Sequence, residues 1–292
     1  MPINWSDLSC VTVPEGRCLP GTAIEIIRPV AGHPAFKAAF FDLDGTLSLI
    51  RSGWMEVMVP MMVEELRKTG TDEPVEALSR LVREMVYRLT GRQTIYQMMA
   101  LADEVRRRGG RPLDPLEYKR AYLERLMGRI AGRLEGLRSG AIPPKDLLVP
   151  GAQAMLALLR DRGLPLVCAS GTDEADCLEE VELLGLAEFF DGRVYGARDD
   201  YRASSKRAVI RQMCEEWDLG RGELLGVGDG FVEMEEVKAA GGVAVGAATE
   251  EPECRRVDQW KRKRLILAGA DLIVPNFLEH QALLGYLLEG SQ

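Results

Sequence analysis

Four short groups of polar residues in the sequence could take part in one reaction. Each combines carboxylate, hydroxyl or ammonium side chains with small neighbours, and each lies where an expected strand ends or a helix begins. The groups are Asp42-Leu43-Asp44-Gly45-Thr46, Ala169-Ser170-Gly171-Thr172, Ser205-Lys206 and Gly228-Asp229-Gly230-Phe231-Val232-Glu233. A carboxylate can attack an electrophile, carry a proton or bind a hard cation, whereas a hydroxyl and an ammonium can hold an anion. One such group alone is typical of a surface turn, but all of them in this order predict a common site.

The elements that must position these groups alternate along most of the chain. The apolar run 38–41 stops at Asp42 and predicts a buried strand followed by a turn at Gly45. Further strands are expected at 23–27, 164–169, 192–195, 224–227, 242–245 and 271–275, and helices at 152–162, 174–184, 206–217, 232–240 and from 277 onward. This alternation predicts a doubly wound, Rossmann-like α/β fold with a parallel sheet. Ligands of such sheets bind at the carboxyl ends of the strands, where the polar groups lie.

Residues 51–140 differ from the rest of the chain because apolar residues recur there at helical spacing. Four amphipathic helices are expected at 54–67, 75–89, 94–108 and 115–137, with glycine-containing breaks between them. The sequence Ile142-Pro143-Pro144 is expected to close this segment, since paired prolines end helices. We therefore predict an N-terminal extension at 1–36, an α/β catalytic core at 37–50 and 141–292, and an all-helical cap at 51–140.

The composition of this chain of 292 residues excludes several classes of protein. Its net charge is −8, whereas nucleic-acid-binding domains are normally basic, so no nucleic-acid partner is expected. The basic runs Arg106-Arg107-Arg108 and Lys261-Arg262-Lys263-Arg264 are interpreted as solvated faces of helices. No apolar run reaches the roughly 18 residues of a membrane-spanning helix. The 6 cysteines form no Cys-x-x-Cys pair, so reduced thiols in a cytoplasm are expected rather than a zinc cluster.

The four polar groups together resemble the haloacid dehalogenase superfamily of phosphotransferases. The first motif of that superfamily reads Asp-x-Asp-Gly-Thr, and its later motifs supply a Ser or Thr, a Lys and an acidic pair, as residues 42–46, Ser170, Lys206, Asp229 and Glu233 do here. The resemblance covers about residues 37–275. A helical insertion soon after the first motif also resembles the helical-cap subclass, which contains sugar-phosphate phosphatases, phosphoglycolate phosphatase and β-phosphoglucomutase. The resemblance implies a phosphatase that acts on a small phosphorylated metabolite. A monomer or homodimer is expected.

The resemblance also implies a role for each catalytic position, and each role has a physical reason. A phosphate monoester dianion repels an anionic nucleophile, so an enzyme must neutralise charge, align the attack and protonate the leaving group. Asp42 is expected to attack phosphorus and form an aspartyl-phosphate, and Asp44 to act as general acid and base. Ser170, the main-chain amide of Gly171 and Lys206 are expected to bind the phosphate. Thr46 is assigned to the phosphate site and is expected to hydrogen-bond within the turn.

A Mg²⁺ ion is the cofactor that the resemblance implies. Asp42 and Asp229 are the expected carboxylate ligands, with the main-chain carbonyl of Asp44 as a third. Glu233 is expected to bind the metal directly or through a water molecule, because many relatives have the shorter Asp there.

Arg51 follows the first motif closely and is predicted to bind a second anionic group of the substrate.

Three alternative functions remain open at this stage. A mutase similar to β-phosphoglucomutase would use the same aspartyl-phosphate but return the phosphoryl group to the sugar. A dehalogenase is a weaker interpretation, because that chemistry needs no metal and would leave Asp44, Asp229 and Glu233 without a purpose. A catalytically inactive sensor of a phosphorylated ligand belongs to a different class, although all catalytic positions here hold competent residues.

Overall fold

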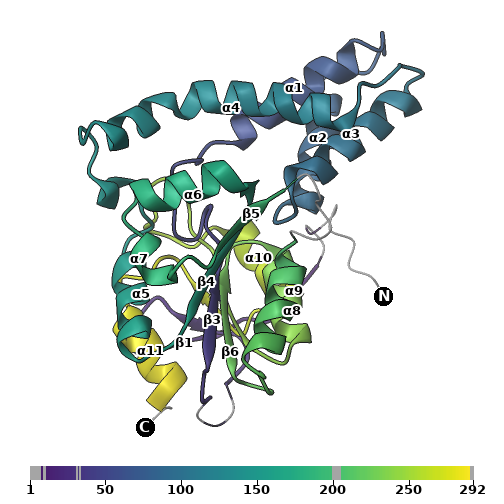
Figure 1. Ribbon diagram of the computed structural model, residues 1–292. Helices are drawn as coiled ribbons and strands as arrows, with labels where there is room; N and C mark the ends of the chain where they lie inside the picture. The colour runs from purple at the N-terminus through teal and green to yellow at the C-terminus, as the bar shows by residue number, and fades with distance from the viewer. Residues whose placement is uncertain (1–7, 9–10, 31, 33, 199–204, 290–292) are drawn as a thin grey trace.

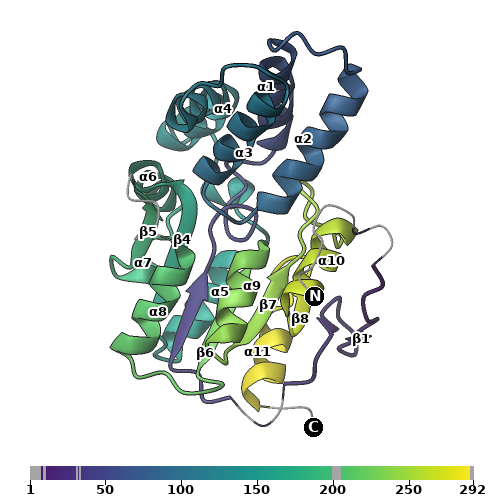
Figure 2. The same cartoon turned by 90° about the vertical axis from the view of Figure 1, so that its right-hand side faces the viewer.

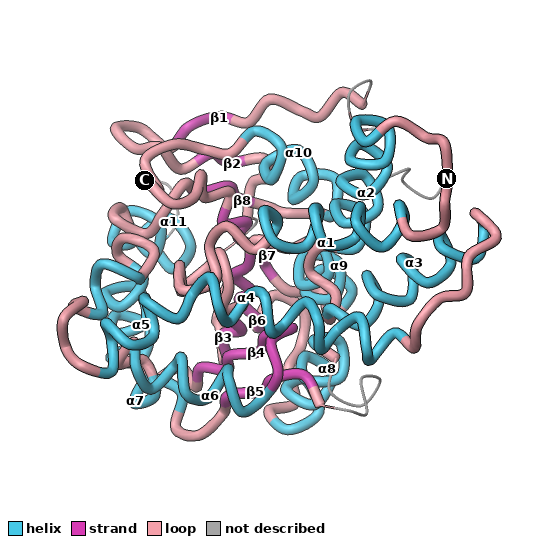
Figure 3. Tube along the Cα trace, turned by 90° about the horizontal axis from the view of Figure 1, so that it is seen from above, coloured by secondary structure: helices cyan, strands magenta, loops and turns pink. Residues whose placement is uncertain are grey.

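The computed structural model describes residues 8, 11–30, 32, 34–198 and 205–289, and it confirms the predicted fold class. In this part of the chain one sheet of 8 strands lies between two layers of helices (Figures 1 and 3). Its strands, in spatial order, are β1 (Arg17–Cys18), β2 (Glu25–Ile26), β8 (Leu272–Val274), β7 (Val243–Ala247), β6 (Leu224–Gly228), β3 (Ala38–Phe41), β4 (Leu166–Asp173) and β5 (Val194–Ala197). The strands from β8 to β5 pair in parallel, whereas β1 and β2 add an antiparallel hairpin at one edge.

Strand β3 lies in the interior of the sheet because all of its side chains are apolar and all are buried. Its parallel register pairs Phe41 with Cys168 of β4 on one side and with Val227 of β6 on the other. The carboxyl ends of these three strands therefore lie side by side. This register brings the segments after them to one edge of the sheet, as the sequence pattern predicts.

Two layers of helices cover the sheet, and each buries an apolar core against it (Figure 3). One layer contains α5 (Ala152–Asp161), α6 (Glu174–Leu183), α7 (Ala187–Phe190) and α11 (His280–Glu289), and the other contains α8 (Lys206–Glu216), α9 (Phe231–Ala239) and α10 (Gln259–Ala268). Most of these helices were expected within three residues of their observed bounds. The sequence pattern does not indicate α7, which is a single turn, or α10.

Helices α1 (Met55–Arg67), α2 (Val75–Leu89), α3 (Thr94–Arg107) and α4 (Pro115–Arg138) pack together beyond the carboxyl edge of the sheet (Figures 1 and 2). Their bounds lie within one residue of those expected, since each has an apolar stripe at helical spacing. In α2 the buried stripe consists of Leu78, Val82, Met85 and Val86. Asp114 and Glu117 form a capping box that fixes the start of α4. A short 3-10 helix, Pro144–Leu147, follows the paired prolines.

The hairpin of β1 and β2 fastens the N-terminal segment to the sheet. Strand β2 falls within the expected strand at 23–27, and β1 is an addition to the prediction. Glu25 of β2 accepts hydrogen bonds from the Arg262 guanidinium of α10 at 2.5 and 2.6 Å. Residues 1–7, 9, 10, 31 and 33 of the predicted extension lie outside the described residues. Within the described ranges, no helix has the length and apolar content required to cross a bilayer.

Candidate active site

Asp42 and Lys206 form a buried ion pair at the carboxyl edge of the sheet. Asp42 follows β3 directly and is 4% exposed. Lys206 is the first residue of α8, and its Nζ lies 2.7 Å from Asp42 Oδ1 and 3.0 Å from Glu233 Oε1. Ser205 caps this helix by accepting a hydrogen bond from the Ala208 amide at 3.2 Å, which fixes where α8 begins. The structure thus brings the predicted nucleophile, lysine and second acidic position together.

Carboxylates outnumber cations at this point of the structure. Oxygens of Asp42, Asp229 and Glu233 all lie within 4.8 Å of one another. Burial raises the pKa of the Asp42 carboxyl, and although Lys206 opposes this rise, repulsion from Glu233 and Asp229 adds to it. Glu233 is fully buried, and its Oε2 has no hydrogen-bond partner within the described part of the chain. Such a cluster of buried oxygens with too little positive charge fits a hard divalent cation.

Two hydroxyls from β4 orient Asp44. The Ser170 hydroxyl donates to Asp44 Oδ2 at 2.8 Å, and the Thr172 hydroxyl donates to the same oxygen at 2.9 Å. The Thr172 amide in turn donates to Ser170 Oγ at 2.9 Å. The role of the Thr172 side chain has no local signal in the sequence, because nothing in a Ser-Gly-Thr sequence shows that the hydroxyl reaches a residue 128 positions away.

The turn after Asp44 differs from the prediction at Thr46. The Thr46 side chain is fully buried, and its hydroxyl makes no hydrogen bond to any described residue, so the expected bond within the turn is wrong. Thr46 also does not line the pocket described below, which leaves its predicted phosphate contact without support in the geometry. Gly45 has φ +74°, and a Cβ at this position would lie 2.4 Å from Asp229 Oδ2. Glycine therefore allows Asp229 to approach the turn.

Arg51 lies beside the site as predicted, but its guanidinium already forms ion pairs with two carboxylates. Its Nε donates to Glu180 Oε1 at 2.9 Å and its Nη2 donates to Asp176 Oδ2 at 3.0 Å, and both carboxylates belong to α6. Arg51 is 6% exposed, and Asp44 Oδ1 lies 4.0 Å from its Nε. The guanidinium therefore joins the base of the helical segment to the core, and little of its charge remains for a substrate anion.

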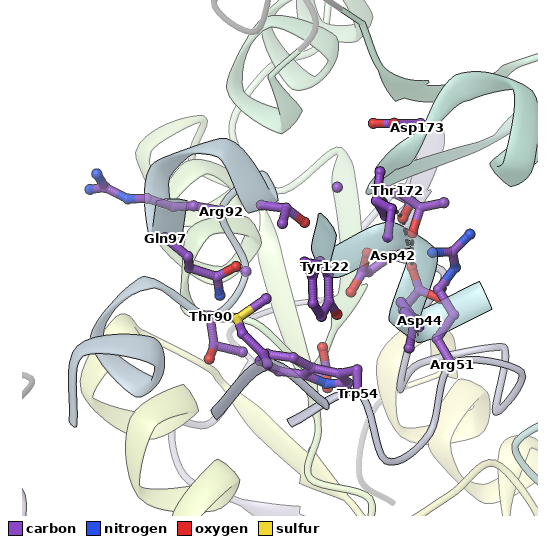
Figure 4. A pocket seen from close by; sticks show the side chains of 18 of the residues that line it. Asp42, Asp44, Arg51, Trp54, Thr90, Arg92, Gln97, Tyr122, Thr172 and Asp173 are labelled. Carbon is purple, nitrogen blue, oxygen red and sulfur yellow. Dashed lines mark hydrogen bonds and ion pairs between the residues drawn. The ribbon is translucent and has the colours of Figure 1, made fainter. Parts of the chain in front are cut away.

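A pocket of about 760 Å³, including the open solvent at its mouth, lies between the carboxylates and helices α1, α3 and α4 (Figure 4). Asp42, Asp44, Ser170, Gly171, Lys206 and Asp229 border it on the sheet side. On the helical side Trp54, Met58, Gln97, Tyr122 and Leu126 are buried or half-buried. The exposed Arg92 borders the pocket as well, but its side chain points away from Asp42 and Asp44 (Figure 4). Gln97 and Tyr122 are each 4% exposed, and both border the pocket. The helical side thus places two neutral polar groups next to the pocket.

The loop between α2 and α3 closes the pocket opposite Arg51. A Cβ on Gly91 in this loop would lie 3.2 Å from the Cα of Gly230, so the two segments meet backbone to backbone. Next to this contact the rings of Tyr87 and Trp260 pack with centroids 4.1 Å apart. Helix α10, which carries Trp260, therefore touches the helical segment as well as the sheet.

The interpretation of the basic run 261–264 as a solvated face is wrong. The Lys261 side chain is 14% exposed, and its Nζ lies 2.9 Å from Asp229 Oδ2 and 2.6 Å from Glu251 Oε1. Burial lowers the pKa of Lys261, but the two carboxylates raise it more strongly. Arg264 is 2% exposed and stacks on Trp260, with its Cζ 4.4 Å from the ring centroid. The run was misjudged because its partners are distant in sequence.

Comparison with known families identifies the class of this protein. A family model described as haloacid dehalogenase-like hydrolase matches residues 36–241, which is more than half of the chain. The chain belongs to this family and is a hydrolase of the haloacid dehalogenase superfamily, as the resemblance in the sequence implies. Among curated proteins, no sequence gave a significant match.

Solved structures share this fold at low sequence identity. A predicted phosphatase from Clostridium acetobutylicum is 20% identical with a TM-score of 0.54, over 85% of this chain and 98% of its own. A haloacid dehalogenase-like family protein from Streptococcus pneumoniae is 18% identical with a TM-score of 0.53, over 86% and 99%. CbbY from Rhodobacter sphaeroides, solved with xylulose 1,5-bisphosphate, is 22% identical with a TM-score of 0.52, over 84% and 96%. These similarities establish the fold.

Proposed function

We propose that this hydrolase is a Mg²⁺-dependent phosphatase that cleaves a small phosphorylated metabolite through an aspartyl-phosphate on Asp42. The observation that carries this proposal is the position of Asp42, which borders the pocket while Lys206 holds its Oδ1 at 2.7 Å. This ion pair restricts rotation of the carboxylate and leaves its other oxygen for attack on phosphorus. Lys206 also supplies a positive charge next to the incoming phosphate.

Asp44 is proposed as the general acid and base. Its Oδ2 accepts two hydroxyl hydrogen bonds, from Ser170 and Thr172, which hold the carboxyl group beside the pocket. A proton on Asp44 would pass to the leaving alkoxide, and the carboxylate so formed would then take a proton from the water that hydrolyses the aspartyl-phosphate. The Gly171 amide is proposed to contact the phosphate oxygens, and the Ser170 hydroxyl, which has a single proton, would turn from Asp44 to the phosphate when the substrate binds, since both residues border the pocket.

The proposed metal site uses Asp42, Asp229 and the main-chain carbonyl of Asp44. Glu233 is proposed to act through a water molecule, because its Oε1 is already bound by Lys206 and by the Gly230 amide at 3.0 Å. Its unpartnered Oε2 is the atom that favours this assignment. When bound, Mg²⁺ would neutralise charge on the phosphate and on the carboxylates.

The lining of the pocket favours a substrate with an uncharged alcohol portion. Arg51 was predicted to bind a second anionic group, but its guanidinium is paired with Glu180 and Asp176. Arg92 also borders the pocket, but its side chain points away from Asp42 and Asp44 (Figure 4). Gln97 and Tyr122 instead offer neutral hydrogen-bonding groups. A sugar phosphate therefore fits this proposal better than a substrate similar to phosphoglycolate, which carries a carboxylate.

Three further parts of the proposal concern the whole chain. Residues 51–140 are proposed as a cap that covers the pocket, on a core made of 37–50 and 141–292. A reducing cytoplasm is proposed as the compartment, in keeping with the free thiols of the cysteines that the structure describes. A monomer or homodimer is proposed as the active form.

The experiment that tests the function measures phosphate release from a panel of phosphorylated metabolites, with Mg²⁺ or with EDTA. Asp42→Asn should reduce turnover by more than about 10³-fold, because the nucleophile is lost. Asp103→Asn is a matched control, since the Asp103 side chain is 64% exposed on α3. Metal-independent turnover, or full activity of Asp42→Asn, would refute the mechanism. An isomerised sugar phosphate without free phosphate would identify a mutase instead.

A further inference from the structure

The first turn of α10 carries a lysine where the helix itself disfavours one. Asp258 caps the helix by accepting hydrogen bonds from the amides of Trp260 and Lys261 at 2.8 and 2.9 Å. The N-terminal end of a helix has a partial positive charge, which repels cations in the first turn. The position of Lys261 therefore needs a partner that outweighs this repulsion.

That partner is a pair of carboxylates on two other segments. Lys261 Nζ lies 2.9 Å from Asp229 Oδ2 and 2.6 Å from Glu251 Oε1, and the three side chains are only 14 to 18% exposed. Gly45 provides the space they occupy, because a Cβ there would lie 2.4 Å from Asp229 Oδ2 and 3.0 Å from Glu251 Oε1. The ammonium is therefore enclosed between the two acids.

Only one of these two carboxylates belongs to the acidic cluster. Asp229 has an oxygen within 4.8 Å of oxygens of Asp42 and Glu233, whereas Glu251 is not part of that group. A divalent cation that binds Asp229 would share this carboxylate with the Lys261 ammonium. The two positive charges would repel each other, and the repulsion is weakly screened in a site with little solvent.

We propose that Lys261 is a positioning residue that holds Asp229 in place and lowers the affinity of this site for a divalent cation, while Glu251 limits the effect by sharing the ammonium. This proposal rests on the proposed metal site. It assigns a purpose to a lysine and a glutamate that the phosphatase mechanism does not use.

The test is a calorimetric titration of Mg²⁺ into the full-length protein without substrate. Lys261→Met should lower the Kd for Mg²⁺ by about tenfold, because a cation next to Asp229 is removed. Glu251→Gln should raise the Kd by a few-fold, since the ammonium then pairs with Asp229 alone. The double variant should match Lys261→Met, because Glu251 acts only through the lysine.

Two controls separate this effect from a general loss of structure. Lys238→Met removes a lysine outside the site, whose Nζ lies 2.7 Å from Asp271 Oδ2. This variant should leave the Kd for Mg²⁺ unchanged. Lys261→Arg keeps the charge and should restore a Kd close to that of the wild type. Circular dichroism in EDTA checks that each variant is folded.

The outcomes distinguish this inference from the proposed function. If the wild type binds Mg²⁺ and Asp229→Asn does not, the metal site stands, and an unchanged or weaker affinity in Lys261→Met would refute the role of Lys261 alone. If the wild type binds no Mg²⁺, both the metal site and the role of Lys261 are overturned. Opposite changes in Lys261→Met and Glu251→Gln would support the inference.

Discussion

Replacement of Lys206 by methionine tests the electrostatics of the site without relying on any substrate. The Lys206 side chain is 7% exposed, and it is the ammonium that contacts both Asp42 and Glu233, at 2.7 and 3.0 Å. Methionine has a similar length but no charge, so two buried carboxylates would lose their counter-ion. Removal of one partner from a buried ion pair typically costs about 3–5 kcal/mol. We expect Lys206→Met to lower the free energy of unfolding by that amount in EDTA.

A second substitution should recover part of the loss. Asp42→Asn removes one of the two carboxylates that lack a counter-ion in Lys206→Met. The double variant Lys206→Met with Asp42→Asn should therefore be more stable than the sum of the two single effects predicts, by at least about 1 kcal/mol. In the wild-type background Asp42→Asn should cost less than Lys206→Met, because Lys206 keeps Glu233 at 3.0 Å as its partner and burial already raises the pKa of the Asp42 carboxyl.

The assay is urea unfolding followed by circular dichroism and by tryptophan fluorescence. Coincident curves from the two probes are required before a free energy is calculated, and the transition midpoint is compared otherwise. Lys68→Met is the surface control, since Lys68 is 66% exposed beside Glu65 and should contribute no more than about 1 kcal/mol. A cost below about 1 kcal/mol for Lys206→Met, or strict additivity with Asp42→Asn, would refute the reasoning.

Two further predictions follow from the turn and from the base of the helical segment. Gly45→Ala should cost about 1–2 kcal/mol of backbone strain and should displace Asp229, so both the melting temperature and Mg²⁺ affinity should fall; an unchanged Mg²⁺ titration would contradict this. Burial and Asp44 raise the pKa of Glu180 from 4.5 to about 7, although Arg51 opposes them. The folded protein then binds more protons than the unfolded chain between these values, so the free energy of unfolding should fall as pH rises, by at most about 1.4 kcal/mol per pH unit. Glu180→Gln should abolish this slope, and equal slopes in both proteins would count against it.

The fold and the centre of the site were predictable because their signals are local. The run 38–41 is wholly apolar and stops at Asp42, which identifies a buried strand and its end without knowledge of the rest of the fold. The helices at 51–140 have regular apolar stripes, so their ends could be predicted within one residue. Parallel pairing then brings Asp42, Ser170 and Asp229 to one edge of the sheet.

The missed features depend on contacts between distant positions. Arg51 was assigned to the substrate because its partners on α6 lie 125 and 129 residues further along the chain. Helix α10 was missed because four successive cations interrupt its apolar periodicity, and its basic side chains are satisfied by Glu25, Asp229 and Glu251 on other segments. No local pattern indicates which of these charges is buried.

The contacts on the two sides of the pocket differ in strength, and this has a consequence for how a substrate enters. On one side the buried Arg51 is paired with Glu180, and breaking such a pair costs about 3–5 kcal/mol. On the other side the loop at Gly91 contacts Gly230, and Arg264 donates one long hydrogen bond of 3.3 Å to the Thr90 carbonyl. Tyr87 packs there on Trp260, a kind of contact worth about 0.5–1.5 kcal/mol. The helical segment should therefore rotate about the Arg51–Glu180 contact and separate from the core at the Tyr87–Trp260 contact. A substrate should enter the pocket on the side of Tyr87 and Trp260.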